Sequence, residues 1–373
     1  MRTYVMYLAL VAGLAFAFTP PAYAGKPIVE VAFVLDTTGS MSGLIERAKQ
    51  KIWSIATSIA EANPDAEIRM ALVAYRDVGD EYVTRKFDLT TDIQSLYGEL
   101  LKFAANGGGD WPESVNEALD VAVTKLNWSQ GPDICKIVFL VGDAPPHMDY
   151  KQDRKYPEIV ADAKARGILI NTVQAGNAQD TMRIWREIAQ RSDGKYLHIP
   201  QDGGVAIIIE TPYDREIIEL QGRLNHTLLP YGSRERQEKV QMQATRSVDA
   251  PAPTATDIAS YLLKRSGPRG VVTGDGDLVA DTASGRVKLD EVPERELPQN
   301  LQRLAPKERQ AEIDRQLAAR KQIDEKLAAL VKQRDVYVAA EKQKRFKDSK
   351  KDSFDQVVEE TLRTQVRRKA ITN

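Results

Sequence analysis

The chain has 373 residues, of which 42% are hydrophobic and 28% are charged, so its composition suits a folded globular protein with some exposed helix. A formal net charge of −1 excludes a strong overall attraction to nucleic acid or to an acidic membrane surface. Residues 301–373 carry 19 Lys and Arg against 12 Asp and Glu, so this tail is basic and the preceding part is acidic. The length allows two domains, or one domain with long extensions.

The N-terminus has the pattern of a secretory signal peptide. An almost wholly apolar run from Tyr4 to Phe18 follows Arg2, and PAYA places small residues at the −3 and −1 positions for cleavage after Ala24. The alternative is a membrane anchor, but a span needs about 20 apolar residues and this run is shorter. We therefore expect residues 1–24 to be removed, and no transmembrane segment in the mature chain.

Cys135 is the only cysteine, which excludes an intramolecular disulfide. It begins an apolar run, so we expect it to be a small buried hydrophobic residue. An exported chain without disulfides, behind a short signal of the bacterial type, predicts a protein of the bacterial periplasm or a secreted one.

From residue 28 to about 212, short apolar runs alternate with amphipathic segments. The expected strands are 28–35, 67–75, 83–89, 135–141, 168–174 and 195–199. The expected helices are 43–61, 92–104, 113–126, 156–166, 180–191 and roughly 203–210. This alternation predicts an α/β fold with a mostly parallel sheet covered on both faces. The short link before 83–89 predicts a hairpin, which makes 83–89 an antiparallel edge strand.

The rest of the chain has a weaker pattern. We expect this C-terminal region to be mainly helical, with a helix within 212–232 and a short helix over 352–368. Residues 233–300 are expected to begin with a charged helix and to form a connector or a small module. The spacing of acids in GDGDLVADTASG does not fit a helix-loop-helix calcium site. The expected parts are therefore 1–24, 25–212, 213–300 and a charged helical tail over 301–373.

A long amphipathic helix is expected over 306–347. Its apolar residues have helical spacing, but Arg320 and Arg334 stand where a heptad repeat would want apolar side chains, so the case for a coiled coil is weak. Two alternatives stay open: the helix packs on its own domain, or it forms a partner or self-association surface.

Oxygen-bearing side chains follow the predicted strand ends. Asp36 ends strand 28–35 and precedes Thr38 and Ser40, Asp143 follows strand 135–141, and Asp110 stands just before the helix at 113. The loops after the carboxyl ends of parallel strands form one rim, so these residues should converge. Like charges held so close repel each other, and a hard divalent cation removes the problem.

Each of these residues also has a purely local explanation. Ser40 or Ser42 could cap the helix at 43, Asp110 and Glu113 match a capping box, and Asp143 could be an ordinary turn residue. The convergence of three loops favours a metal site over three separate local roles.

The segments FVLDTTGSMSG, GGGDWPES and FLVGDAPPH together resemble the von Willebrand factor type A domain and its metal-ion-dependent adhesion site. Asp36, Thr38 and Ser40 match the family's Asp-x-Ser/Thr-x-Ser motif, and Asp143 matches its last motif. The middle position is usually Thr; here it is Asp110, in a GGGDxPE variant that is similar to the hemicentin-like branch and to some atypical kinases. The resemblance covers about residues 28–212 and implies a doubly wound sheet of six strands with one antiparallel edge strand.

The resemblance also implies how the site would work. Thr38 and Ser40 would coordinate the ion directly, and Asp36 and Asp143 directly or through water. Mg²⁺ is the expected ion, with Ca²⁺ or Mn²⁺ as alternatives, and Asp110 would add negative charge that holds it more tightly. An Asp or Glu of a partner protein would fill the open coordination position. The residues expected to line the partner-binding rim are Arg76, Asp77, Trp111, His147 and Tyr150.

Three classes of function remain to be compared. The first is an exported, metal-dependent protein-binding module without catalytic residues. The second is a metal-dependent hydrolase or phosphotransferase with Asp36 as nucleophile and His147 as base. Such a phosphatase needs a second acid at position 38, where this chain has Thr38, and no GxSxG, P-loop or HExxH motif is present. The third is a scaffold that assembles through residues 306–347. The sequence favours the first class.

Overall fold

The computed structural model describes residues 26–131, 133–204, 208–265, 270–346 and 354–371. The expected signal peptide therefore lies outside the described residues. Within these ranges, no helix combines the length and the apolar character that a membrane crossing requires.

The centre of the fold is a six-stranded sheet in the order β3-β2-β1-β4-β5-β6. Its strands are β1 (Ile28–Asp36), β2 (Glu67–Tyr75), β3 (Thr84–Thr90), β4 (Ile134–Gly142), β5 (Ile168–Ala175) and β6 (Tyr196–Ile199). All neighbouring strands are parallel except β2 and β3, which are antiparallel. The predicted α/β fold, with a mostly parallel sheet and an antiparallel edge strand, is confirmed.

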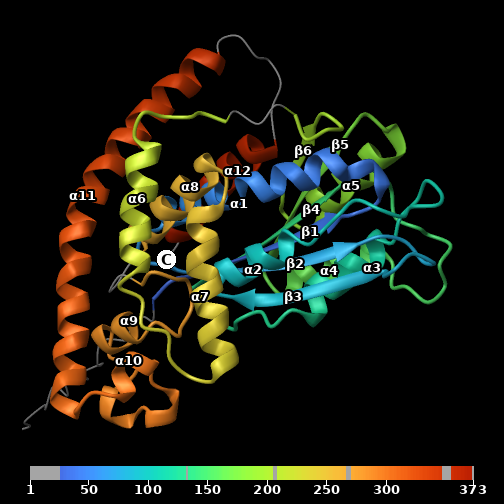
Figure 1. The fold of residues 1–373 in the computed structure, drawn as a ribbon. Helices are drawn as coiled ribbons and strands as arrows, with labels where there is room; N and C mark the ends of the chain where they lie inside the picture. The colour runs from blue at the N-terminus through green and yellow to red at the C-terminus, as the bar shows by residue number, and fades with distance from the viewer. Residues whose placement is uncertain (1–25, 132, 205–207, 266–269, 347–353, 372–373) are drawn as a thin grey trace, which may run out of the picture.

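Helices cover both faces of this sheet (Figure 1). On one face lie α1 (Ser42–Ala62) and α2 (Ile93–Leu100). On the other lie α3 (Val115–Asp120), α4 (Tyr156–Ala165) and α5 (Gln179–Arg191). A π-helix over Val121–Lys125 continues α3, and a 3-10 turn over Gly39–Met41 precedes α1.

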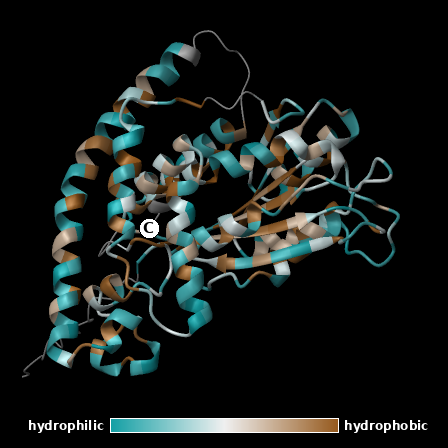
Figure 2. Cartoon of the chain, in the orientation of Figure 1, coloured by the Kyte–Doolittle hydropathy of each residue, from teal (hydrophilic) through white to brown (hydrophobic). Residues whose placement is uncertain are grey.

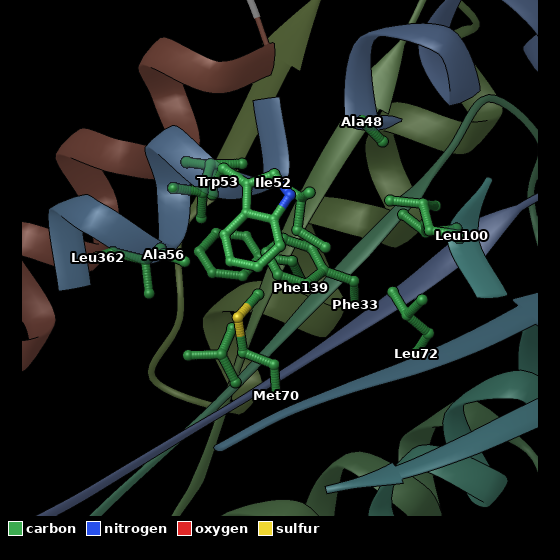
Figure 3. Packing of buried hydrophobic residues seen from close by; sticks show 14 of the residues in the cluster. Phe33, Ala48, Ile52, Trp53, Ala56, Met70, Leu72, Leu100, Phe139 and Leu362 are labelled. Atoms are coloured by element: carbon green, nitrogen blue, oxygen red, sulfur yellow. The ribbon is translucent and has the colours of Figure 1, made fainter. Parts of the chain in front are cut away.

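Successive residues of β1 contribute to the two cores in turn, because side chains alternate across a strand. Phe33 belongs to the core under α1, whereas Val34 belongs to the core under α3, α4 and α5. Figure 3 shows Trp53 of α1 above Phe33, Met70 and Phe139 of the sheet. The central strands are correspondingly hydrophobic, whereas the edge strand β3 is mostly hydrophilic (Figure 2).

The expected helix over 203–210 is wrong for the residues that can be judged. Residues 205–207 lie outside the described ranges, and residues 203, 204 and 208–210 are not helical. Gly203 and Gly204 have φ angles of 81° and 75°, in the left-handed region that glycine adopts readily and that a right-handed helix cannot continue through.

The C-terminal half is mainly helical, which confirms the prediction for this region. Its α-helices are α6 (Asp214–Asn225), α7 (Arg234–Asp249), α8 (Ala252–Lys264), α9 (Leu278–Ala283), α10 (Gln299–Gln302), α11 (Pro306–Phe346) and α12 (Phe354–Ile371). Two 3-10 turns, Leu289–Glu291 and Glu294–Glu296, lie between α9 and α10. Pro253 stands in the first turn of α8, where its missing N–H breaks no helical hydrogen bond.

Two of these helices complete the core of the sheet. Tyr261 of α8 and Leu362 of α12 belong to the same buried cluster as Trp53 of α1, and the Trp53 and Tyr261 rings lie 5.5 Å apart. Asn171 of β5 and Gln365 of α12 form a buried pair of amide hydrogen bonds, at 3.0 and 2.8 Å. The end of the chain therefore packs beside the first helix, as Figure 1 shows.

The long helix α11 lies along α6, α8 and α9 and is held by buried ion pairs (Figure 1). The Arg320 guanidinium donates to both carboxylate oxygens of Asp277, at 2.7 and 3.0 Å. Arg334 pairs with Asp214 at 3.2 Å and with Asp257 at 2.8 Å. The arginines that interrupt the heptad pattern thus bind the helix to its own chain. Self-association through residues 306–347 stays a prediction.

Replacing Arg320 by Met should destabilise the protein by about 3–5 kcal/mol, because the buried Asp277 carboxylate would lose its counter-charge. Arg315→Met on the same helix removes an exposed pair with Glu312 and should cost about 0–1 kcal/mol. Urea unfolding of the two variants measures the difference. Adding Asp277→Asn to Arg320→Met should recover part of the loss. Equal, small effects of Arg320→Met and Arg315→Met would contradict this assignment.

Candidate metal site

Asp36 lies at the carboxyl end of β1 and is fully buried. Its Oδ1 accepts hydrogen bonds from the Thr38 backbone N–H at 2.9 Å and from the Thr38 hydroxyl at 2.7 Å. The Thr38 hydroxyl is in turn 3.4 Å from the Ser40 hydroxyl. The buried Tyr75 hydroxyl lies next to the Asp36 Oδ2 atom at Gly142, yet neither atom has a well-formed hydrogen bond among the described residues. Such an orphaned carboxylate oxygen is costly unless a cation or a proton satisfies it.

Sheet register brings Asp143 to the same edge. Leu35 of β1 pairs with Val141 of β4, so Asp36 lies level with Gly142 and next to the segment that continues into Asp143. A side chain on Gly142 would place its Cβ 3.0 Å from Asp36 Oδ2, so glycine permits this close approach. The Asp143 carboxylate is nearly buried and accepts a hydrogen bond from Gln201 at 2.6 Å.

Glu113 is a third carboxyl group at this edge, and the sequence analysis gave it only a capping role. In the structure α3 begins at Val115, and the buried Glu113 side chain has an Oε2 atom without a hydrogen-bond partner in the described part of the chain. Gly108, at φ 80°, lies so close that an added Cβ would be 3.1 Å from both Glu113 Oε1 and Thr38 Cβ. The GGGDWPE loop thus packs Glu113 beside Thr38. The sequence feature that could have predicted this position of Glu113 is that it belongs to the same motif as Asp110.

Simultaneous ionisation of these carboxyl groups is unfavourable, and the pKa values of two of them are raised. Burial, followed by the charge of Asp143, raises the pKa of Asp36 to about 7. Burial, followed by the charges of Asp36, Asp77 and Asp143, raises the pKa of Glu113 to about 9. A cluster with such values can keep protons at neutral pH, or it can exchange them for a cation. Its donors are all oxygen atoms, which is the ligand set of hard divalent ions.

Asp110 has a different neighbourhood from the one expected. Its side chain is 60% exposed, and its Oδ2 lies 3.5 Å from the Nε2 of His147. The next residue, Trp111, donates a hydrogen bond from its indole to Asp180 at 2.7 Å, and the Glu113 backbone N–H donates to the Pro145 carbonyl at 3.0 Å. These contacts set the direction of the loop, so Asp110 lies against His147 and Glu113 lies beside Thr38.

Three of the expected rim residues are buried. Arg76 donates hydrogen bonds to the carbonyls of Thr37 at 3.2 Å and Ala104 at 2.9 Å, so it ties together the two loops behind the site. Asp77 and His147 are also buried. The rim side chains that reach solvent are Trp111, which is 48% exposed, and the half-buried Tyr150.

The comparison with known families agrees with this arrangement. Residues 30–211 match the family model described as von Willebrand factor A domain. This part of the chain is a von Willebrand factor A domain. Domains of this family mediate protein–protein interactions and commonly bind a divalent cation.

Two curated relatives match part of this chain. The alpha-protein kinase vwkA of Dictyostelium discoideum is 27% identical over 136 residues, which cover 34% of this chain and 20% of the kinase. The von Willebrand factor A domain-containing protein 7 of Rattus norvegicus is 26% identical over 196 residues, or 52% of this chain and 21% of that protein. The match thus spans about a fifth of the length of these relatives. Among solved structures, the SpRpn10 VWA domain aligns with a TM-score of 0.36 at 11% identity, over 48% of this chain and 89% of that domain.

The raised pKa values of the von Willebrand factor A domain predict a pH dependence of stability without divalent ions. The pKa of Glu113 is about 9 in the folded protein and ordinarily 4.5, so the folded state binds more protons than the unfolded state between these values. The unfolding free energy should therefore fall as pH rises through this window. Asp36 adds to the fall only up to about pH 7.

Glu113→Gln should flatten the slope between pH 7 and 9 in urea unfolding with a chelator present. Glu291→Gln, at an exposed surface pair with Lys288, is the matched control and should leave the slope unchanged. A wild-type protein whose stability is constant or increases over this range would contradict the assignment.

Proposed function

We propose that this protein is an exported von Willebrand factor A domain protein that binds a divalent cation, preferably Mg²⁺ over Ca²⁺ or Mn²⁺. Asp36, Thr38, Ser40 and Asp143 would hold the ion, and an Asp or Glu of a partner protein would complete its coordination. The observation that carries the proposal is the buried, unpaired Oδ2 of Asp36 beside two further carboxyl groups.

The residues present fit an oxygen-coordinated cation. Two hydroxyl groups and the carboxylate of Asp36 already touch one another, and the next strand end supplies Asp143. A divalent cation would replace the protons that Asp36 and Glu113 otherwise keep at neutral pH, and so would remove the repulsion between them. Glu113 adds charge from beside Thr38, which is the role that the sequence gave to Asp110.

Binding rather than catalysis is supported by the surroundings of His147, the residue considered as a general base. Its Nδ1 lies 2.9 Å from Asp149, and its Nε2 faces Asp77 and Asp110, each at 3.5 Å. Both ring nitrogens therefore face carboxylates other than Asp36, so the imidazole is not placed to act as a general base for Asp36. We therefore assign no catalytic residue.

The surface beside the site suits a protein partner. Trp111 and Met148 directly follow Asp110 and His147, whose side chains adjoin, and they are 48% and 46% exposed. Exposed aromatic and sulfur-containing side chains next to a charged centre are typical of interface hot spots. The periplasmic or secreted location rests on the sequence of residues 1–24 and on the single cysteine.

Mg²⁺ should raise the melting temperature of the purified protein by several degrees. Saturation at 100 times the Kd stabilises the folded state by about 2.7 kcal/mol, because the ion binds that state alone. Asp36→Asn should abolish the rise, yet be at least as stable as wild type in a chelator, since it removes a buried charge. Asp193→Asn, at an exposed pair with Lys164, is the control and should respond like wild type. If Mg²⁺ does not change the melting temperature of the wild-type protein, the proposed metal site is wrong.

Partner binding needs its own measurement. A protein captured from the cell envelope should be retained by wild type in Mg²⁺ and released by EDTA, and it should not be retained by Asp36→Asn. Trp111→Ala should weaken its capture without changing the Mg²⁺-dependent melting temperature. Capture that is insensitive to both EDTA and Asp36→Asn would rule out coordination of the ion by the partner.

A further inference from the structure

A second group of potential ligands lies on three loops next to this site. Asp77 follows β2, Asp110 belongs to the GGGDWPE loop, and His147 follows β4. His147 Nε2 is 3.5 Å from Asp77 Oδ2 and 3.5 Å from Asp110 Oδ2, and one ligand atom from each residue lies within 4.8 Å of the others. We propose that these three side chains form a second metal site, for a first-row transition ion of the Zn²⁺ type.

The imidazole of His147 is buried and faces carboxylates at both of its nitrogens. It is 95% buried, and its Nε2 has no hydrogen-bond partner in the described ranges. Asp149 lies 2.9 Å from Nδ1, so a neutral ring that donates from Nδ1 directs its Nε2 lone pair at two carboxylates. The other neutral tautomer directs its Nδ1 lone pair at Asp149. A proton on both nitrogens, a proton on a facing carboxyl group or a metal ion at Nε2 would each remove this repulsion, and either proton would form a short hydrogen bond.

The distances favour the metal ion over the second proton. A charged imidazolium hydrogen bond to a carboxylate is about 2.7–2.9 Å long, and both Nε2 contacts are 3.5 Å. Two ligands of a tetrahedral ion with bonds of about 2.1 Å are separated by about 3.4 Å. The Nε2 atom is therefore spaced from each carboxylate oxygen as two ligands of a common ion are, and the three ligand atoms lie within 4.8 Å of one another.

Neighbouring side chains fix the orientation of these ligands. The Tyr150 hydroxyl donates to Asp77 Oδ2 at 2.8 Å, and the Ser114 hydroxyl donates to Asp77 Oδ1 at 2.8 Å. The Tyr150 ring stacks on the His147 ring, with centroids 3.9 Å apart. The Asp149 contact with Nδ1 is the carboxylate–histidine arrangement that supports metal-binding imidazoles in other proteins.

The ligand set also distinguishes this site from the first one. One imidazole nitrogen with two carboxylates suits Zn²⁺ and its transition-metal neighbours, whereas the oxygen-only donors around Asp36 suit Mg²⁺. Asp110 is 60% exposed on its side chain, so the site opens to solvent and leaves room for a fourth ligand. This assignment gives the third carboxylate of the motif a role of its own, whether or not the first site binds a cation.

The test is a calorimetric titration of the full-length mature protein with ZnCl₂ in saturating Mg²⁺, with metal content measured after dialysis. Wild type should bind one Zn²⁺ per chain, and Co²⁺ in its place should give visible absorption bands with an intensity typical of four- or five-coordinate Co²⁺. His147→Gln should lose this binding, while its Mg²⁺-dependent melting temperature stays that of wild type. His198→Gln, at an exposed histidine, is the control and should bind Zn²⁺ normally.

Variants of the other residues sharpen the result. Asp110→Asn should weaken Zn²⁺ binding strongly, and Asp149→Asn should weaken it by about 10–100-fold, as loss of an orienting partner does. Asp36→Asn should keep the Zn²⁺ site and lose only the Mg²⁺ response. The proposal is overturned if wild type binds no Zn²⁺ in saturating Mg²⁺, if His147→Gln binds it as well as wild type, or if Asp36→Asn abolishes it.

Discussion

Repulsion between buried carboxylates at the ends of β1 and β4 is the constraint on which the rest of this site depends. Asp36 and Asp143 are brought together by strand register, and Glu113 joins them from a neighbouring loop. Burial, together with the neighbouring charges, raises the pKa of Asp36 and of Glu113. The fold tolerates this arrangement because two hydroxyl groups and a glycine-rich loop surround it. A cation there would convert the repulsion into affinity.

The same principle extends to the loops around His147. Asp77, Asp110 and Asp149 surround the His147 imidazole, so a cation there would likewise offset their negative charge. Tyr150 and Ser114 hold the Asp77 carboxylate in place. The main chain links the two clusters, since the His147 N–H donates to the Glu113 carbonyl at 3.1 Å. One edge of the sheet thus holds a hard, oxygen-only cluster beside a softer one that contains nitrogen. Because the two sites differ in donor type, each would prefer a different ion: Mg²⁺ at the oxygen-only site and a Zn²⁺-type ion at the site with the imidazole.

The helical second half supports the sheet and is not a detachable tail. Tyr261 and Leu362 complete the core over α1, and α1 begins directly after the loop that carries Thr38 and Ser40. Arg320 and Arg334 are buried in ion pairs that fix α11 against the chain. Buried pairs of this kind contribute more to choosing one packing arrangement than to net stability. They explain why a helix with a weak heptad pattern nevertheless has a defined position.

The sequence by itself determined the sheet. Continuous apolar runs of five to nine residues mark strands buried on both faces, and the short link before Thr84 marks the antiparallel edge. It also placed Asp36 and Asp143 at one rim, because all parallel strands end at the same edge. It also predicted a mainly helical C-terminal region, but it did not give the bounds of the helices over 233–300, because these helices gain much of their stability from packing on distant segments.

Only the tertiary structure decided which carboxylate of GGGDWPE lies beside Thr38. The loop has no periodicity, so the direction of each side chain depends on contacts with remote residues. Trp111 is held by Asp180, and the Glu113 backbone is held by Pro145. Those two contacts put Glu113 next to Thr38 and Asp110 next to His147, and no local pattern encodes them.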